Sequence, residues 1–291
     1  MKAAAGKAVI SLCLFLILSA VPGAAGPREI RLIIRGDDLG MTQGSLPAFE
    51  KALNQGVLTC ASIVVPGPWF EGAAELCRKN PGWCTGVHLC LVGEWRGMRW
   101  RPVLPWDKVS SIVDEDGFLY GYPDELFARK PKLEELEAEL RAQVELAKKK
   151  GINVQYIDTH YLSPSDPGYP GLAGVIRKIG ADYNIPVSGS IGEQGLSIYQ
   201  VPVEERQETA VKMLEELEPG LWCWVCHPGI DSPEQHALIH TAPGHIKMQG
   251  VGRRRTEMLN VLTSLELKSV ILKEGIILTD YKKLWKQEHK R

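Results

Sequence analysis

The sequence lacks a strong charge of either sign, since its 291 residues carry a formal net charge of −1 at pH 7. Proteins that bind nucleic acids or anionic membranes through a broad field usually have a basic excess, so the composition argues against both partners. The chain has no glycine-rich phosphate loop, which argues against a nucleotide site. Beyond residue 25 it has no apolar run of about 20 residues, so we expect no membrane insertion of the mature chain.

The first 25 residues have the pattern of a secretory signal peptide. Two lysines supply positive charge, residues 8–20 form an apolar run that is too short for a comfortable membrane span, and small residues end at Ala25. We expect cleavage after Ala25 and export of residues 26–291 as one domain. An uncleaved signal that anchors the protein in a membrane is the alternative.

Cysteines are few, and six of the seven lie beyond the signal. In an exported protein an even number permits disulfides, and Cys77 and Cys84, which flank an Asn-Pro-Gly turn sequence, are the expected pair. Cys223 and Cys226 have the spacing of a zinc or redox motif, but they lie in an apolar run that favours a strand. Because side chains three residues apart on a strand point to opposite faces, we interpret both as small buried residues.

Short apolar runs alternate with helical patterns along the mature chain. The expected strands are residues 32–34, 58–65, 85–92, 154–157, 186–190, 221–226 and 276–280. The expected helices are residues 45–54, 69–79, 132–150, 177–183, 204–217 and 256–272, with a basic helix or frayed end from residue 282. This α/β pattern favours a mostly parallel sheet, and about seven such units fit a closed or nearly closed (β/α) TIM-like barrel. An open doubly wound sheet is the alternative.

Residues 93–130 show no clear periodicity and are rich in Trp, Tyr, Arg, Gly and Pro. A long irregular segment within a compact domain is usually functional or disordered, and the aromatic content favours order. Aromatic faces suit sugar rings, although they suit core packing as well. The helix that follows, residues 132–150, has one apolar stripe, and its polar face is expected to be solvated.

Residues that bind metals or transfer protons lie at or near the ends of several expected strands. They are Asp37, Asp38, His88, Asp158, His160 and His227. Each has an ordinary structural interpretation alone, such as a helix cap or turn for paired aspartates and a core position for a histidine among apolar neighbours. Barrels of this type place their chemistry at the carboxyl ends of strands, so the joint occurrence favours a site.

The chemistry of these residues suits a metal-assisted reaction. One aspartate and two histidines can bind Zn²⁺ or another divalent ion and leave positions open for water and substrate. A second aspartate can take a proton from water, and another histidine can protonate a leaving amine. This set can hydrolyse an amide, and the same residues can serve a phosphoesterase or an isomerase.

The order and spacing of these motifs resemble those of the YdjC/ChbG-like carbohydrate deacetylases over nearly all of the mature chain. The matching residues are Gly36-Asp37-Asp38-Leu39-Gly40, Gly56-Val57-Leu58-Thr59 with Ser62, Gly86-Val87-His88-Leu89, Ile157-Asp158-Thr159-His160, His227-Pro228-Gly229, Arg254-Arg255-Thr256-Glu257 and Gly275-Ile276-Ile277-Leu278. The resemblance implies a distorted (β/α) barrel and removal of acetyl groups from N-acetylated sugars such as chito-oligosaccharides. It also implies a divalent metal, Mg²⁺ or Zn²⁺, held by one aspartate and two histidines.

The resemblance further implies a role for each residue. Asp38, His88 and His160 are the expected metal ligands, and Asp37 is the expected base. His227 is the expected acid, or the group that steadies the tetrahedral intermediate.

Two further residues have implied supporting roles, and one position departs from the family pattern. Asp158 is expected to orient a ligand histidine or line the site, and Arg254 to hold the acidic cluster. The departure is Leu162, which stands where the family often has a second histidine. A sugar-binding or metal-binding protein without turnover and a metal-dependent phosphoesterase are the alternatives, and a homodimer is left open.

Overall fold

The structure is a computed structural model that describes residues 29–162, 169, 171–240 and 250–288, so the expected signal peptide lies outside it. Its centre is a sheet of seven parallel strands in the order β5-β3-β2-β1-β7-β6, with β9 paired to β1 beside this path. These strands are β1 Ile30–Leu39, β2 Cys60–Ile63, β3 Cys84–Leu89, β5 Val154–Thr159, β6 Gln194–Leu196, β7 Gly220–Cys226 and β9 Ile277–Thr279. A separate antiparallel pair consists of β4 Trp95–Arg96 and β8 Ile239–His240.

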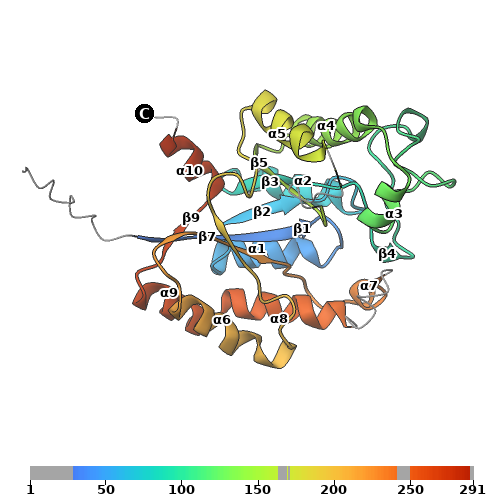
Figure 1. Ribbon diagram of the computed structural model, residues 1–291. Helices are drawn as coiled ribbons and strands as arrows, with labels where there is room; N and C mark the ends of the chain where they lie inside the picture. The colour runs from blue at the N-terminus through green and yellow to red at the C-terminus, as the bar shows by residue number, and fades with distance from the viewer. Residues whose placement is uncertain (1–28, 163–168, 170, 241–249, 289–291) are drawn as a thin grey trace, which may run out of the picture.

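Helices cover the sheet on two sides, with α4 and α5 on one and α6, α8 and α9 on the other (Figure 1). The helices are α1 Ser45–Gln55, α2 Phe70–Lys79, α3 Pro123–Ala128, α4 Leu133–Lys149, α5 Leu172–Tyr183, α6 Arg206–Glu215, α7 Pro233–His236, α8 Val251–Thr263, α9 Leu265–Lys273 and α10 Tyr281–Glu288, with 3₁₀ turns at Trp106–Lys108 and Val203–Glu205. None of the helices in the described part of the chain has an apolar stretch long enough to cross a bilayer.

Successive residues of β1 face two different layers, as the strand period of two requires. Leu32 and Ile34 belong to the large core that packs under the helices, whereas Ile33 lies in a small inner cluster with Tyr156 and Tyr281. Tyr281 begins α10 and stacks on Tyr156, with ring centroids 4.4 Å apart. The face of the sheet that carries Ile33 therefore has an apolar cluster, and the polar residues of this face lie nearer the carboxyl ends of the strands.

The sheet is parallel and α/β, as predicted, but it does not close into a barrel within the described residues. Its edges are β5 and β6. The expected strand at residues 186–190 makes only a single bridge, in which Ser188 N donates to Ile157 O at 2.8 Å and Ile157 N donates to Pro186 O at 3.1 Å. This segment partly fills the gap between the edges without the regular pairing that a closed barrel requires.

The expected Cys77–Cys84 disulfide is wrong, because both cysteines are free and buried. Cys77 lies on α2 and packs into the large core under the helices, whereas Cys84 begins β3 and faces the inner cluster. The turn between them therefore joins two sides of the sheet. Cys223 and Cys226 are buried single residues, as predicted.

Two helical expectations also need correction. The region expected as one helix at residues 256–272 forms α8 and α9, because Ser264 has an extended backbone and accepts a hydrogen bond from Leu267 N as the cap of α9. The polar face of α4 is partly buried rather than solvated. Glu139 accepts from the backbone N–H groups of Val103 and Leu104 at 2.9 and 3.0 Å, so α4 holds the irregular segment in place.

Candidate active site

The paired aspartates lie at the carboxyl end of β1, where the strand contains a β-bulge. Gly36 pairs with Ala61 and Leu39 with Ile63, so β1 uses one residue more than β2 between these two pairs. Asp38 has a φ of 74°, which non-glycine residues adopt rarely. Neighbouring residues of a regular strand point to opposite faces, but here both carboxylates line one pocket.

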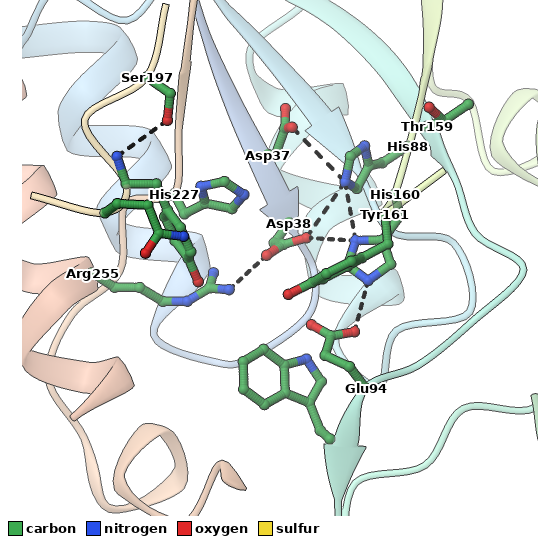
Figure 2. A pocket seen from close by; sticks show the side chains of 13 residues that line it. Asp37, Asp38, His88, Glu94, Thr159, His160, Tyr161, Ser197, His227 and Arg255 are labelled. Carbon is green, nitrogen blue, oxygen red and sulfur yellow. Dashed lines mark hydrogen bonds and ion pairs between the residues drawn. The ribbon is translucent and has the colours of Figure 1, made fainter. Parts of the chain in front are cut away.

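Asp38, His88 and His160 bring three metal-binding atoms together (Figure 2). Asp38 Oδ1 lies 3.6 Å from His88 Nε2 and 3.4 Å from His160 Nδ1, and the two nitrogens are 3.2 Å apart. All three side chains are buried, and Asp38 Oδ1 has no hydrogen-bond partner among the described residues. Ligand atoms about 2.1 Å from a tetrahedral ion are about 3.4 Å from one another, so the three atoms fit one divalent ion.

The remaining polar atoms of this triad are held by hydrogen bonds that orient the ligand atoms. His88 Nδ1 lies 2.8 Å from Asp158 Oδ2, and His160 Nε2 lies 2.8 Å from Glu94 Oε2. A carboxylate that accepts the N–H of one ring nitrogen leaves the lone pair of the other nitrogen for a metal. Asp158 thus lies where an orienting residue is expected. Glu94 was missed, because it lies in the irregular segment, where no periodicity marks it.

Asp37 is fixed beside the triad by the neighbouring Arg35. Arg35 Nε and Nη2 donate to the two carboxylate oxygens of Asp37 at 2.7 and 2.8 Å, and Nη2 also lies 3.1 Å from Asp158 Oδ2. Arg35 is only 7% exposed, and its Nη1 donates to Ser188 Oγ at 2.7 Å. The two hydrogen bonds from Arg35 hold Asp37 at the edge of the triad, with Asp37 Oδ2 3.9 Å from His88 Nε2.

The arginine that holds the acidic cluster is Arg255 and not Arg254. Arg255 Nη2 donates to Asp38 Oδ2 at 2.6 Å, and although burial alone would raise it, this charge lowers the pKa of Asp38 well below its usual range. Arg254 Nη2 instead donates to the backbone oxygen of Tyr199 at 2.5 Å. Consecutive residues of a helix point about 100° apart, so only one of the two can face Asp38.

His227 follows β7 directly and lines the same pocket as the triad and Asp37. Its Nδ1 is buried and has no hydrogen-bond partner among the residues that the structure describes, and the centroid of its ring lies 5.0 Å from that of Tyr199. Burial lowers the pKa of His227 to about 4, and the nearby carboxylates do not offset this. The imidazole is therefore neutral at pH 7.

The pocket has a volume of about 280 Å³ and aromatic walls. Trp95, Tyr161 and Tyr199 line it together with the ligand-type residues, and Tyr161 is 39% exposed. Leu162, by contrast, is 4% exposed and belongs to the apolar core. Leu162, which stands where the family often has a second histidine, therefore lies in the core and does not line this pocket.

The buried charges of the site leave a need for a cation. Four carboxylates, those of Asp37, Asp38, Glu94 and Asp158, meet two guanidinium groups, those of Arg35 and Arg255, which leaves two negative charges. Burial disfavours a positive charge on His160, but Glu94 and Asp38 outweigh it and raise the pKa of His160 to about 10. The donor set and its charge both fit a divalent ion.

Comparisons with known proteins find relatives that match most of the chain. A carbohydrate deacetylase of Enterococcus faecalis (strain V583) is 30% identical over 275 residues, which cover 87% of this chain and 98% of that protein. A carbohydrate deacetylase of Vibrio cholerae serotype O1 is 25% identical over 267 residues, which cover 88% and 96%.

A solved structure from Enterococcus faecalis V583, described as a proposed cellobiose-phosphate cleavage protein, superimposes with a TM-score of 0.70 and 26% identity over 88% of this chain and 99% of that one. The sequence profile of the family described as "YdjC-like protein" matches residues 31–273, which is most of the chain. The family predicted from the motifs is thereby confirmed, and the chain belongs to the YdjC-like family.

Proposed function

We propose that this protein is an enzyme, a metal-dependent hydrolase that removes acetyl groups from N-acetylated carbohydrates of the chito-oligosaccharide class. The names of the related carbohydrate deacetylases support the reaction. The observation that carries the metal dependence is the convergence of Asp38 Oδ1, His88 Nε2 and His160 Nδ1, each oriented by a partner on its far side.

A divalent ion, Zn²⁺ or Mg²⁺, would be held by Asp38, His88 and His160. Bound there, such an ion supplies positive charge that polarises an amide carbonyl and makes water more acidic. With the ligand histidines neutral, it would also balance the two negative charges that Arg35 and Arg255 leave. Asp158 and Glu94 keep the two histidines in the ring orientation and tautomer that binding requires.

Asp37 is the proposed base, which takes a proton from the attacking water. Asp37 lies at the edge of the triad, so it is within reach of a water that would also contact the metal position. The two hydrogen bonds from Arg35 fix the orientation of the Asp37 carboxylate. Because a carboxylate has two lone pairs on each oxygen, these two hydrogen bonds leave acceptor capacity for the water.

His227 is the proposed partner of the oxygen that becomes negative in the tetrahedral intermediate. A buried imidazole that is neutral at pH 7 carries one N–H group, which suits hydrogen-bond donation better than full proton transfer. Of the two roles expected for His227, this geometry and charge favour steadying the intermediate. The proton for the leaving amine is then available from Asp37 after it has accepted one from water.

The substrate class is supported by the walls of the pocket. Trp95, Tyr161 and Tyr199 offer aromatic surface beside the polar centre, as a sugar ring with an N-acetyl group requires. A phosphoesterase would need a cation in this pocket without a carboxylate partner, but Arg35 is paired with Asp37 and Arg255 with Asp38. Export through the N-terminal signal remains part of the proposal, since residues 1–28 lie outside the described chain.

The test is acetate release from N-acetylated chito-oligosaccharides by metal-stripped protein, before and after Zn²⁺, Mg²⁺, Mn²⁺ or Co²⁺ is restored. We expect release only with metal. Asp37→Asn should bind the metal as the wild type does and lose activity by a factor of about 100 or more. Metal-independent release, or full activity of Asp37→Asn, would contradict the proposal.

A further inference from the structure

Behind the candidate active site, arginines from two helices surround a small cavity. Arg206, at the start of α6, lines it together with Arg254 and Arg255 of α8, and Tyr199 and His227 separate it from the pocket. The space has room for about one water-sized group. It is thus a distinct hollow that shares a wall with the active-site pocket.

Arg206 and Arg254 lie together, and neither forms an ion pair with a carboxylate in the described ranges. Nη2 of Arg206 and Nη2 of Arg254 both donate to the carbonyl oxygen of Tyr199, at 3.0 and 2.5 Å, and Arg206 Nη1 donates to the backbone oxygen of Arg254 at 2.6 Å. Arg206 is 1% exposed. The charge of Glu257, on the next turn of α8, only partly offsets the effect of burial and of Arg254 on the pKa of Arg206. Like charges that share one acceptor in a buried place are costly.

The same cavity is lined by residues with unsatisfied nitrogen atoms. Arg254 Nε and Arg255 Nη1 are buried donors without a hydrogen-bond partner in the described part of the chain, and His227 Nδ1 has no partner there either. A buried donor without an acceptor costs about 1–3 kcal/mol, so several at one place are unusual. Burial and the charge of Arg254 lower the pKa of Arg206 to about 10, which agrees with an excess of positive charge here.

We propose that this cavity is a binding site for one small monovalent anion of halide size. Such an anion would accept from Arg254 Nε and Arg255 Nη1 and would compensate the charge of the Arg206–Arg254 pair. A water molecule could accept the same hydrogen bonds but would leave that charge uncompensated. Because the cavity is so small, a monatomic anion is a better candidate than a polyatomic one, and the site does not depend on the reaction proposed for the neighbouring pocket.

The anion site can be located with bromide as the probe. Crystals of the full protein, grown or soaked in bromide, should give an anomalous peak within hydrogen-bonding distance of Arg254 Nε and Arg255 Nη1. In solution, the unfolding midpoint should rise with chloride or bromide and not with gluconate, a larger anion, at constant ionic strength. No peak in the cavity, or equal effects of chloride and gluconate, would overturn the proposal. A peak without any effect of halide in solution would mark an adventitious ion only and would overturn it too.

Two neighbouring arginines on α8 provide a matched pair of variants. Arg254→Gln removes a proposed anion contact and should weaken halide binding about tenfold or more. Arg253→Gln removes the same charge one residue earlier, but Arg253 is exposed and paired with Glu204, so halide binding should not change. Equal halide binding in the two variants would contradict the assignment. If Arg254→Gln fails to fold, the comparison of chloride, bromide and gluconate on the wild-type protein still tests the proposal.

Discussion

Glu94 offers a sharp test of the site, because it supports a ligand without touching the metal position. Its carboxylate lies 2.8 Å from His160 Nε2 and is almost fully buried. A hydrogen bond to a charged group contributes about 1.5–3 kcal/mol. If this bond serves to orient and polarise His160, that free energy corresponds to about 10–150-fold in metal affinity.

Two substitutions of Glu94 separate the loss of its charge from the loss of the hydrogen bond to His160. The amide oxygen of Glu94→Gln can still accept the N–H of His160, so we expect a loss of about tenfold in metal affinity. Glu94→Ala leaves no acceptor, so its loss should reach about 100-fold. Glu115→Gln is the control, because Glu115 is an exposed acid of the same irregular segment and should leave the affinity unchanged.

The assay is competition between metal-stripped protein and a chelating dye for Zn²⁺, with urea unfolding to show that each variant is folded. Affinities should fall in the order wild type, Glu94→Gln, Glu94→Ala. A folded Glu94→Ala protein that binds Zn²⁺ within twofold of the wild type would refute the orienting role of Glu94.

Three other predictions follow from the same contacts. His160→Ala should abolish binding of one Zn²⁺ per chain, measured by calorimetry, and an unchanged stoichiometry would argue for other ligands. In metal-free protein His227 has a pKa of about 4 against an ordinary 6.5, so the unfolded chain binds more protons and stability falls as the pH drops from about 6.5 to 4. His227→Gln should therefore flatten that part of the curve in urea unfolding, and an identical slope would count against a neutral His227. Glu139→Gln places an amide N–H₂ against backbone donors and should cost about 2–3 kcal/mol of unfolding free energy, whereas the exposed Glu134→Gln should cost less than about 0.5.

The sequence allowed the family, the α/β class and the positions of most strands along the chain to be predicted, because each depends on local patterns. Apolar runs mark β1, β3 and β7, and the ligand-type residues lie at the ends of these strands or directly after them. Closure of the sheet depends on pairing between distant segments, and residues 186–190 carry strand propensity without forming the regular ladder. The predicted pairing of Cys77 with Cys84 failed for a similar reason, since a turn brings two cysteines near in sequence but leaves them on opposite sides of a sheet.

The parts of the site that could not be predicted depend on tertiary geometry. Nothing in the sequence marks the bulge that turns Asp37 and Asp38 into one pocket, because a bulge is defined against the partner strand. Glu94 lies in an aperiodic segment, and its position depends on the contacts that hold that segment to α4. The choice between Arg254 and Arg255 depends on the rotation of α8, which begins five residues earlier than expected.

The measurement that tests the central claim most directly is the location of the metal in the wild-type protein. Crystals loaded with Zn²⁺ or Co²⁺ should give an anomalous peak, at the absorption edge of that metal, about 2.1 Å from Asp38 Oδ1, His88 Nε2 and His160 Nδ1. A second set of groups, Asp37, His88 and Asp158, also lies close enough to bind an ion. A peak bound by that set, or no peak in the pocket at all, would contradict the ligand assignment. It would also contradict the proposed roles of Asp38 as a ligand and Asp37 as the base.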